Sequence, residues 1–472
     1  MNVLSSTPLW RKAFRAVRFF ASFVFLASIF VSLNQPAHAL PAFARKYGLR
    51  CSACHESWPM LNYFGQKFKD NGYQIMNDRD APIWQNPGYW PVTFRILPIW
   101  HRVSTGKVAV DQGTGITRIT SSGFDLSGLD FHTGGTLEKN ISFYVLPSSD
   151  NTGAFHFETV MARLDNIKGT PWLNLKLGKF ELDNLLSEKR VLTLTANGGI
   201  YQLYHFSPQG DGNTFGQIGS NQLGIELMGH SYNDRTRYSA ALLSSNNGSV
   251  GFTYGANAYT GFFAASQAFN AGKMGVDRIG FYAMLGQAPT YYLTSGGSPI
   301  SGSGVGNKSF HREGFVGQFY FGEHVDLQVV TQHGWDNAWF GQGYGNIIDA
   351  PGPNNLPGTV LPVGAQAPTW NGVLLEPHYV YSPQLIFIGR YETIRMSRQA
   401  NGSASANPSP SNFGDLSTYT VGMRYNPFMH SRAGFAWHNE YNWLHSVGTG
   451  PGPGLNANIN TSEVLSGFDF DF

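Results

Sequence analysis

The last nine residues of the chain, "VLSGFDFDF" (464–472), decide how the rest of the sequence is interpreted. Phe468, Phe470 and Phe472 alternate with two aspartates, so a strand over this stretch has an aromatic face and an acidic face. As an edge strand of a soluble β-sandwich, it would expose three phenylalanines at the edge of a sheet, which invites aggregation. The stretch therefore predicts a strand in a sheet that closes on itself.

Four further stretches alternate in the same way: "WLNLKLGKF" (172–180), "NQLGIELMG" (221–229), "STYTVGMRY" (417–425) and "AGFAWHNEY" (433–441). In the first of them Leu173, Leu175 and Leu177 face one way, while Lys176 lies on the other face. An apolar outer face and a polar inner face are typical of strands in an outer-membrane β-barrel. An aromatic residue that ends an alternating strand also resembles the recognition signal for barrel insertion.

The composition of the 472 residues suits such a wall. Charged residues make up 13% and aromatic residues 14%, and there are 56 glycines. The formal net charge is +2, which gives no reason to expect nucleic acid or another strongly charged polymer as a partner.

Very short connections, such as 231–234 and 381–383, alternate with long segments rich in Gly, Pro, Asn and Ser, such as 336–370. Short periplasmic turns and long extracellular loops are the arrangement of bacterial barrels, and both barrel ends then lie on the periplasmic side. We predict an all-β, antiparallel transmembrane barrel of about sixteen strands. The expected strands lie near 91–103, 122–136, 139–147, 154–164, 171–180, 221–230, 235–245, 257–267, 276–286, 311–321, 324–335, 371–381, 384–394, 416–425, 431–443 and 460–472. The pattern is weakest at 257–267, which leaves fourteen or eighteen strands as alternatives.

Segment 181–220 is too long for a simple loop. It is either an outer loop that folds back into the lumen or an additional hairpin. Several charged residues are expected on the inner face as ordinary channel lining: His156, Glu158, Glu226, Arg390, Glu392, Arg424, His438 and Glu440.

The first 39 residues are predicted to be a cleaved signal peptide. Arg11, Lys12, Arg15 and Arg18 precede an apolar run over 19–33, and an A-x-A site ends at Ala39. No other run of about 18 apolar residues predicts a transmembrane helix. The predicted domains are therefore the signal peptide (1–39), a small helical segment (40–90) and the barrel (91–472), placed in the bacterial outer membrane.

The small segment contains both cysteines of the chain in the motif C-x-x-C-H, which indicates attachment of a c-type haem. Cys51 and Cys54 are expected to form thioethers to the porphyrin, and His55 is expected to bind the iron as the proximal ligand. A redox-active thiol pair lacks its usual βαβ context here, and a zinc site lacks further cysteines.

A helix is expected directly after the motif, capped by Ser57 and stopped at Asn71-Gly72. The distal ligand stays open. Met76 is the first candidate and His101 the second, with another residue or an open position as alternatives. Met60 lies so near His55 in the chain that it reaches the opposite haem face only with difficulty.

The stretch "PAFARKYGLRCSACHESWPMLNYFGQKFKDNGYQ" (41–74) resembles the N-terminal signature of the fused outer-membrane monohaem cytochrome c–porins. The best-known members of that family are iron oxidases of iron-oxidising bacteria. The matching positions are Pro41, Phe43, Ala44, Arg45, the C-x-x-C-H motif, Pro59, Leu61, Phe64-Gly65, Phe68-Lys69 and Asn71-Gly72-Tyr73. The remainder of the chain matches the family only in architecture.

The resemblance implies an outer-membrane cytochrome c that oxidises extracellular Fe(II) and passes the electron through one haem c to a periplasmic cytochrome c or copper protein. The helical segment would enter the barrel from the periplasmic side as a plug. The alternatives are a conduit for another extracellular donor or acceptor, and a passive porin with a structural haem. No acidic cluster in the predicted loops marks an Fe(II) site, so the catalytic residues stay open.

Overall fold

The computed structural model describes these parts of the chain: 42–76, 80–85, 91–111, 116–149, 153–188, 191–195, 199–208, 213, 215–245, 248, 258–271, 275–290, 305–341, 367–399, 411–412, 415–430, 434–449 and 456–471. The predicted signal peptide (1–39) and the terminal Phe472 lie outside these residues.

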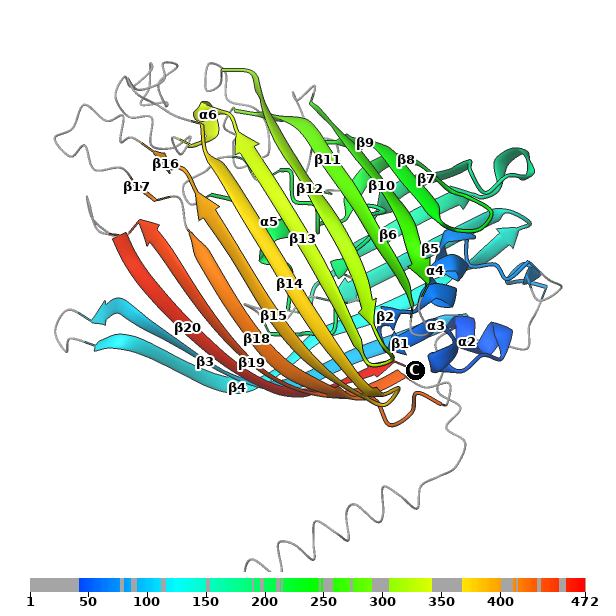
Figure 1. Ribbon diagram of the computed structural model, residues 1–472, viewed down its shortest axis with the longest axis horizontal. Coiled ribbons are helices and arrows are strands. Elements are labelled where there is room, and N and C mark those ends of the chain that lie inside the picture. Colours follow the sequence, from blue (N-terminus) through cyan, green and yellow to red (C-terminus); the bar gives the residue numbers. More distant parts are fainter. Residues whose placement is uncertain are drawn as a thin grey trace, which may run out of the picture. The chain divides into compact units, whose positions relative to one another are not determined.

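Sixteen antiparallel strands form a closed barrel (Figure 1). They are β3 (Val92–Asp111), β4 (Ile116–Glu138), β5 (Ile141–Ser149), β6 (Phe155–Leu164), β7 (Asn174–Phe180), β8 (Gln222–His230), β9 (Thr236–Ser244), β10 (Tyr259–Ala271), β11 (Val276–Pro289), β12 (Asn307–Phe321), β13 (Val325–Asp336), β14 (Thr369–Ser382), β15 (Leu385–Met396), β18 (Leu416–Tyr425), β19 (Gly434–Thr449) and β20 (Asn456–Asp471). Each strand pairs with its neighbours in sequence, and β20 closes the ring against β3. The predicted count of sixteen is confirmed, and so is the strand with the weakest pattern, which is β10.

Period-2 alternation sets which side chains face out. On β18, Val421 is 60% exposed and Arg424 is 0% exposed. On β20, Phe468 and Phe470 are partly exposed, whereas Asp469 between them is buried. The outward face is therefore the apolar wall that a hydrocarbon layer requires, and the predicted faces are confirmed.

Short turns gather at one end of the barrel. β4 and β5 are joined by 139–140, β12 and β13 by 322–324, and β14 and β15 by 383–384. Asn140 and Gly322 take positive φ values of 61° and 69° there, which tight turns between twisted strands require. Because β3 begins and β20 ends at this end, it corresponds to the periplasmic side of an outer-membrane barrel.

The N-terminal segment consists of α2 (Ala42–Tyr47), α3 (Cys51–Cys54), the strand pair β1 (His55–Ser57) and β2 (Met60–Leu61), and α4 (Tyr63–Asp70). The expected helix starts later than predicted. Ser57 does not cap it, because this residue is buried and its hydroxyl accepts a hydrogen bond from Asn426 of the barrel. Asn62 is the N-cap of α4, and Asn71 and Gly72 end the helix as expected.

Contacts to the turns place this segment at the short-turn end of the barrel. Ser52 N donates to the carbonyl of Met429, which lies between β18 and β19. At the C-terminal end of α4, Arg163 of β6 donates to the carbonyl oxygens of Lys69 and Asp70 at 2.8 and 2.9 Å. The segment is therefore fixed to barrel strands on separate parts of the wall (Figure 1).

Residues 181–221 leave the wall after β7 and return to it at β8; we call them the inner segment. Its short helix α5 (Gln202–His205) packs on β14 and β15. In the ring of sixteen, β7 and β15 stand eight places apart whichever way they are counted. The inner segment therefore crosses the lumen from one wall to the opposite one, and its described residues form no additional hairpin of the barrel.

The remaining elements are short. They are η2 (Ile167–Gly169), α6 (Ala338–Gly341) and the pair β16 (Arg398–Gln399) and β17 (Ser411–Asn412). None of the described helices is both long and apolar enough to cross a membrane.

Candidate functional site

The two thiols and the imidazole of the C-x-x-C-H motif line one cavity. Cys51, Cys54 and His55 all face a space of about 550 Å³ between the N-terminal segment, the barrel wall and the inner segment. This volume lies within the range of roughly 300–1,000 Å³ typical of small-molecule and cofactor sites. The three residues that the sequence singles out are thus brought together around a space of cofactor size.

The imidazole of His55 is oriented by a backbone contact. Its Nδ1 donates a hydrogen bond to the carbonyl oxygen of Pro59 at 3.1 Å. A histidine that binds a metal commonly donates its other ring N–H in this way, which fixes the tautomer and the ring orientation. The contact assigns Nε2 as the nitrogen that would bind iron.

Aromatic rings from the N-terminal segment form one side of the cavity. Phe43 stacks on Tyr73 with ring centroids 4.8 Å apart, and Phe68 meets Phe43 edge to face at 5.3 Å. Tyr73 in turn stacks on Tyr144 of β5 at 5.9 Å. A flat apolar macrocycle would find matching surfaces here, since such rings bury large areas and pack in defined geometries.

The start of α4 packs directly on the motif. Asn62 N donates to the carbonyl of Cys54 at 2.9 Å, and the Asn62 side chain caps the helix at Gly65 N. A Cβ added at Gly65 would lie 2.0 Å from the Cys54 carbonyl oxygen, so only glycine fits this close approach. Asn62 and Gly65 support the site, although the sequence pattern alone did not single out either role.

Cys51 is buried and Cys54 is half-buried, and the surroundings activate neither thiol. Burial raises the pKa of Cys51 to about 12, with a smaller contribution from Asp471, and burial raises the pKa of Cys54 to about 11. Reactive thiol pairs have lowered pKa values. The surroundings therefore disfavour a redox-active disulfide pair and fit thiols that serve as attachment points.

A carboxyl group that the sequence reasoning missed lies next to His55. Burial, followed by the charge of Asp326 on β13, raises the pKa of Glu56 to about 8. At neutral pH this side chain is therefore mostly protonated and uncharged.

Cationic side chains around the cavity are held by carboxylates. Arg95 bonds to Asp469 at 2.9 Å, Arg163 to Asp165 at 2.7 Å, and Lys176 pairs with Glu226. The segment side of the lining is mostly apolar, with Arg50 and Lys69 as its cations, and the lining fits a covalently attached haem with His55 as the proximal ligand.

The expected distal ligands do not line this cavity. Met76 is 55% exposed, and His101 on β3 lies 3.9 Å from Glu463. Met60 is buried in a separate apolar cluster, where its sulfur accepts a hydrogen bond from Gln328 at 3.5 Å. The barrel side chains of haem-ligand type that line the cavity are His132, Tyr144 and Met161.

Two carboxylates of the wall hold the backbone of the inner segment. Glu392 on β15 accepts from the amides of Gln202 and Leu203 at 3.0 and 2.5 Å. Glu440 on β19 accepts from the amides of Leu194 and Thr195, with shortest distances of 2.8 and 3.0 Å. Backbone donors deep in the lumen thereby gain partners that water would otherwise have to supply.

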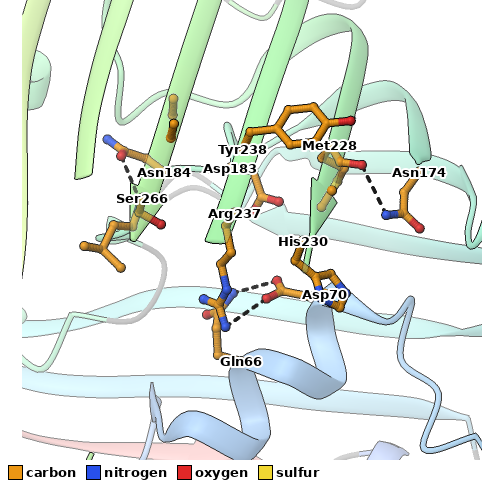
Figure 2. Close-up of a pocket in the computed structure, with 14 residues that line it drawn as sticks. Gln66, Asp70, Asn174, Asp183, Asn184, Met228, His230, Arg237, Tyr238 and Ser266 are labelled. Atoms are coloured by element: carbon orange, nitrogen blue, oxygen red, sulfur yellow. Dashed lines mark hydrogen bonds and ion pairs between the residues drawn. The ribbon is translucent and has the colours of Figure 1, made fainter. Parts of the chain in front are cut away.

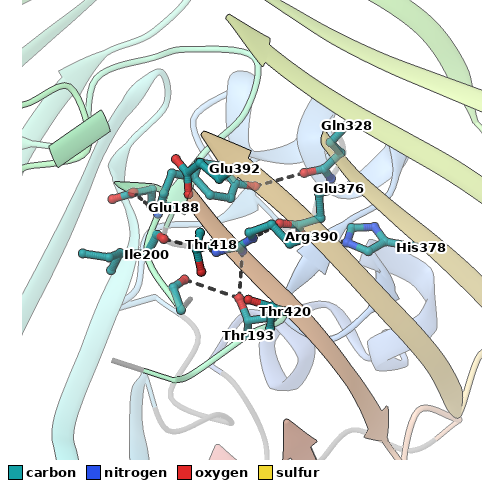
Figure 3. Close-up of polar contacts among 12 residues, drawn as sticks. Glu188, Thr193, Ile200, Gln328, Glu376, His378, Arg390, Glu392, Thr418 and Thr420 are labelled. Atoms are coloured by element: carbon teal, nitrogen blue, oxygen red, sulfur yellow. Dashed lines mark hydrogen bonds and ion pairs between the residues drawn. The ribbon is translucent and has the colours of Figure 1, made fainter. Parts of the chain in front are cut away.

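Two arginines hold the same segment by its oxygens. Arg390 donates to the carbonyl of Ile200 at 3.1 Å and to the hydroxyl of Thr193 at 2.7 Å (Figure 3). Arg424 donates to the carbonyl of Leu192 at 3.2 Å. Glu226, Arg390, Glu392, Arg424, His438 and Glu440 are all buried, so these six expected channel-lining residues are instead internal packing groups.

A second, much smaller cavity of about 40 Å³ lies where α4 meets β8 and β9 (Figure 2). Arg237 reaches from β9 to Asp70 on α4 at 3.2 Å and also bonds Asp234 at 2.5 Å. This cavity has room for a few water molecules and belongs to the attachment of α4 to the wall. Among the described residues, no three His, Cys, Asp or Glu side chains gather so that they could hold a metal ion.

No protein-family model matches the chain, and no curated protein is similar to it in sequence. The fold resembles solved porin structures. An anion-selective porin from Comamonas acidovorans is 12% identical with a TM-score of 0.50, over 81% of this chain and 99% of the porin. OmpF of Salmonella typhi is 8% identical with a TM-score of 0.48, over 83% of this chain and 100% of OmpF. OprB of Pseudomonas putida is 9% identical with a TM-score of 0.47, over 81% of this chain and 94% of OprB.

At such identities the likeness concerns the fold alone. Together with the closed ring and its apolar outer face, it makes the chain a porin-like, sixteen-stranded barrel of the bacterial outer membrane.

Proposed function

We propose that this barrel is a cytochrome that oxidises extracellular Fe(II) and delivers the electron to a periplasmic cytochrome c or copper protein, with one haem c attached at Cys51 and Cys54. It would then be an Fe(II):cytochrome c oxidoreductase. The observation that carries the proposal is the single cavity that both thiols and His55 line, inside the periplasmic end of a membrane barrel. The resemblance of residues 41–74 to the fused cytochrome–porins supplies the donor.

When bound, a haem supplies a one-electron Fe(III)/Fe(II) couple. The protein's own part is to hold this couple in a membrane that otherwise separates donor from acceptor by about 30 Å of hydrocarbon. Ser52, Asn426 and Arg163 fix the N-terminal segment to the barrel at its short-turn end, where a periplasmic acceptor could reach it. The donor loses one electron outside and becomes Fe(III), and the acceptor gains one inside.

The inner segment makes a passive porin a weaker alternative than an electron-transfer protein. Glu392, Glu440, Arg390 and Arg424 bond to it at six backbone positions across the lumen. A segment fixed across the lumen narrows the path for solutes, whereas it leaves electron transfer through a bound haem unhindered. A lumen that a fixed segment crosses therefore favours the proposal over free diffusion of solutes.

The proposal is tested by stopped-flow mixing of the purified, oxidised protein with Fe(II) over a range of pH. Reduction of the haem within the mixing experiment supports the proposal, and failure to reduce at every pH contradicts it. The haem midpoint potential distinguishes Fe(II) oxidation from the remaining alternative, a conduit for another extracellular donor or acceptor. A strongly positive value agrees with Fe(II) as donor, while a low value indicates electron transfer outward or another donor.

A further inference from the structure

We propose that the thioether sulfur of Met161, on the lumenal face of β6, is the axial ligand opposite His55. This inference rests on the proposed attachment of haem c at Cys51 and Cys54 and names a ligand that neither the C-x-x-C-H motif nor the N-terminal segment contains. The barrel wall would then supply one side of the metal centre and the N-terminal segment the other.

Met161 shares one cavity with the C-x-x-C-H motif. Met161 lines the cavity that also contains Cys51, Cys54 and His55, and it is the one methionine among the described residues that do so. Its side chain is 9% exposed and packs in the same apolar cluster as Tyr47, Phe68 and Tyr73. A sulfur ligand is thus already present within the apolar surroundings that a haem face would occupy.

The strand that carries Met161 is firmly attached to the N-terminal segment. Arg163, the next lumen-facing residue along β6, donates to the carbonyl oxygens of Lys69 and Asp70 and pairs with Asp165 at 2.7 Å. Because this arginine clamps the end of α4, the depth of Met161 relative to the N-terminal segment is fixed. Ligands held by packed strands keep their geometry better than ligands on loops.

The other methionines proposed as ligands are engaged in other contacts or lie outside the cavity. The sulfur of Met60 accepts a hydrogen bond from Gln328, and Met76 is mostly exposed. His132 lines the cavity, but its Nδ1 lies 2.5 Å from the Tyr144 hydroxyl and its Nε2 lies 3.9 Å from the Asp130 carboxylate. The Nδ1 of His132 and the hydroxyl of Tyr144 therefore engage each other, and the Nε2 of His132 is the alternative that the experiment has to separate from Met161.

A methionine in a core is more often simple packing, so the assignment needs a readout that packing would not produce. Axial methionine raises the potential of a c-type haem. It also gives ferric haem a weak red absorption band that depends on the iron–sulfur bond. Met161→Leu removes the sulfur while nearly conserving volume, so the barrel should still fold.

The experiment compares ferric spectra and chemically poised redox titrations of the whole holoprotein in detergent, without Fe(II). We expect the wild type to show the sulfur band, and Met161→Leu to lose it and to shift the midpoint potential downward. Met161→His should restore a six-coordinate, low-spin spectrum without the sulfur band. Met60→Leu and Met76→Leu are the matched controls and should leave both spectrum and midpoint unchanged.

Three results would overturn the assignment: a wild type without the sulfur band, a band that persists in Met161→Leu, or a band that disappears in Met76→Leu instead. A spectrum altered only in His132→Gln would assign the ligand to that histidine and overturn Met161 as well. Fe(II) takes no part in these titrations. Failure of Met161 as ligand therefore stays distinct from failure of Fe(II) to reduce the haem.

Discussion

The carboxylate of Glu392 on β15 accepts a hydrogen bond from the backbone amide of Leu203 at 2.5 Å, inside the lumen. This contact joins the middle of the inner segment to the strand that faces its starting point across the barrel. Glu440 makes the equivalent contacts to Leu194 and Thr195 one step earlier in the segment. The inner segment therefore crosses the lumen with its backbone hydrogen-bonded to side chains of the wall.

Because the inner segment crosses the lumen, we predict that the barrel conducts ions poorly. In planar bilayers we expect the wild type to give no steady porin-sized conductance. Glu392→Ala combined with Glu440→Ala leaves up to four buried amides without an acceptor, at a cost of about 1–3 kcal/mol for each group. The double variant should therefore release the inner segment from the wall and show open-channel currents.

Glu323→Ala, in the exposed turn before β13, is the matched control and should behave as the wild type does. Steady conductance from the wild-type barrel at low voltage would contradict a closed lumen.

The attachment site predicts a specific loss in cysteine variants. Replacing Cys51 and Cys54 together by serine should abolish haem that survives denaturing electrophoresis, because no thioether can form. The sixteen-stranded barrel should still assemble, since its closure between β20 and β3 involves neither residue. In-gel haem staining and heat-modifiable mobility measure the two properties separately, and haem that stays covalently bound in the double variant would refute the attachment.

Arg163 is predicted to be the strongest single anchor of α4. Arg163→Met removes the bonds to the Lys69 and Asp70 carbonyls and leaves the buried Asp165 carboxylate without its cation. Loss of one partner from a buried ion pair costs about 3–5 kcal/mol. Urea unfolding followed by tryptophan fluorescence should show a destabilisation of that order.

Lys168→Ala removes a neighbouring exposed cation and is expected to change the free energy of unfolding by less than about 0.5 kcal/mol. Equal effects of the two substitutions would show that Arg163 does not anchor the helix.

The lowered pKa of Asp183 leads us to predict how the stability of the fold depends on pH. Burial alone would raise the pKa of this carboxyl, but the charges of Lys69, Lys176 and Arg163 outweigh it and hold the pKa below its ordinary value. A carboxyl whose pKa is lowered in the folded state stabilises the fold above its unfolded pKa of about 3.9 and loses this contribution as the pH falls further. Asp183→Asn should therefore be less stable than wild type by about 1–3 kcal/mol at pH near 7.

The difference in stability between the two proteins should shrink once the pH falls below about 3.9, as measured by urea unfolding near pH 7 and near pH 2. A difference in stability that stays constant between these pH values would contradict the lowered pKa of Asp183.

The barrel was predictable because its signal is local. Alternation such as that of Phe468, Asp469 and Phe470 reports the two faces of a strand directly, whatever lies elsewhere in the chain. Sixteen strands could therefore be counted, although their ends extend further than expected, as in β4, which starts at Ile116 rather than near residue 122.

The lumen was less predictable because its contacts join distant residues. The local sequence predicts that Ser57 caps a helix, but its hydroxyl accepts a hydrogen bond from Asn426, some 370 positions later in the chain. Glu392 and Glu440 read as channel lining because nothing near them in sequence shows that backbone amides of the inner segment will reach them. Met161 lies in a strand whose alternation explains it fully, so only the shared cavity draws attention to it.

The central claim is electron transfer across a sealed membrane, and it is tested most directly in lipid vesicles. The purified holoprotein is inserted into vesicles that enclose oxidised cytochrome c, and Fe(II) is added outside. We predict reduction of the enclosed cytochrome with one Fe(II) consumed per cytochrome reduced, and none with the Cys51→Ser, Cys54→Ser double variant. No reduction with the wild type, or equal reduction with the double variant, would contradict the account.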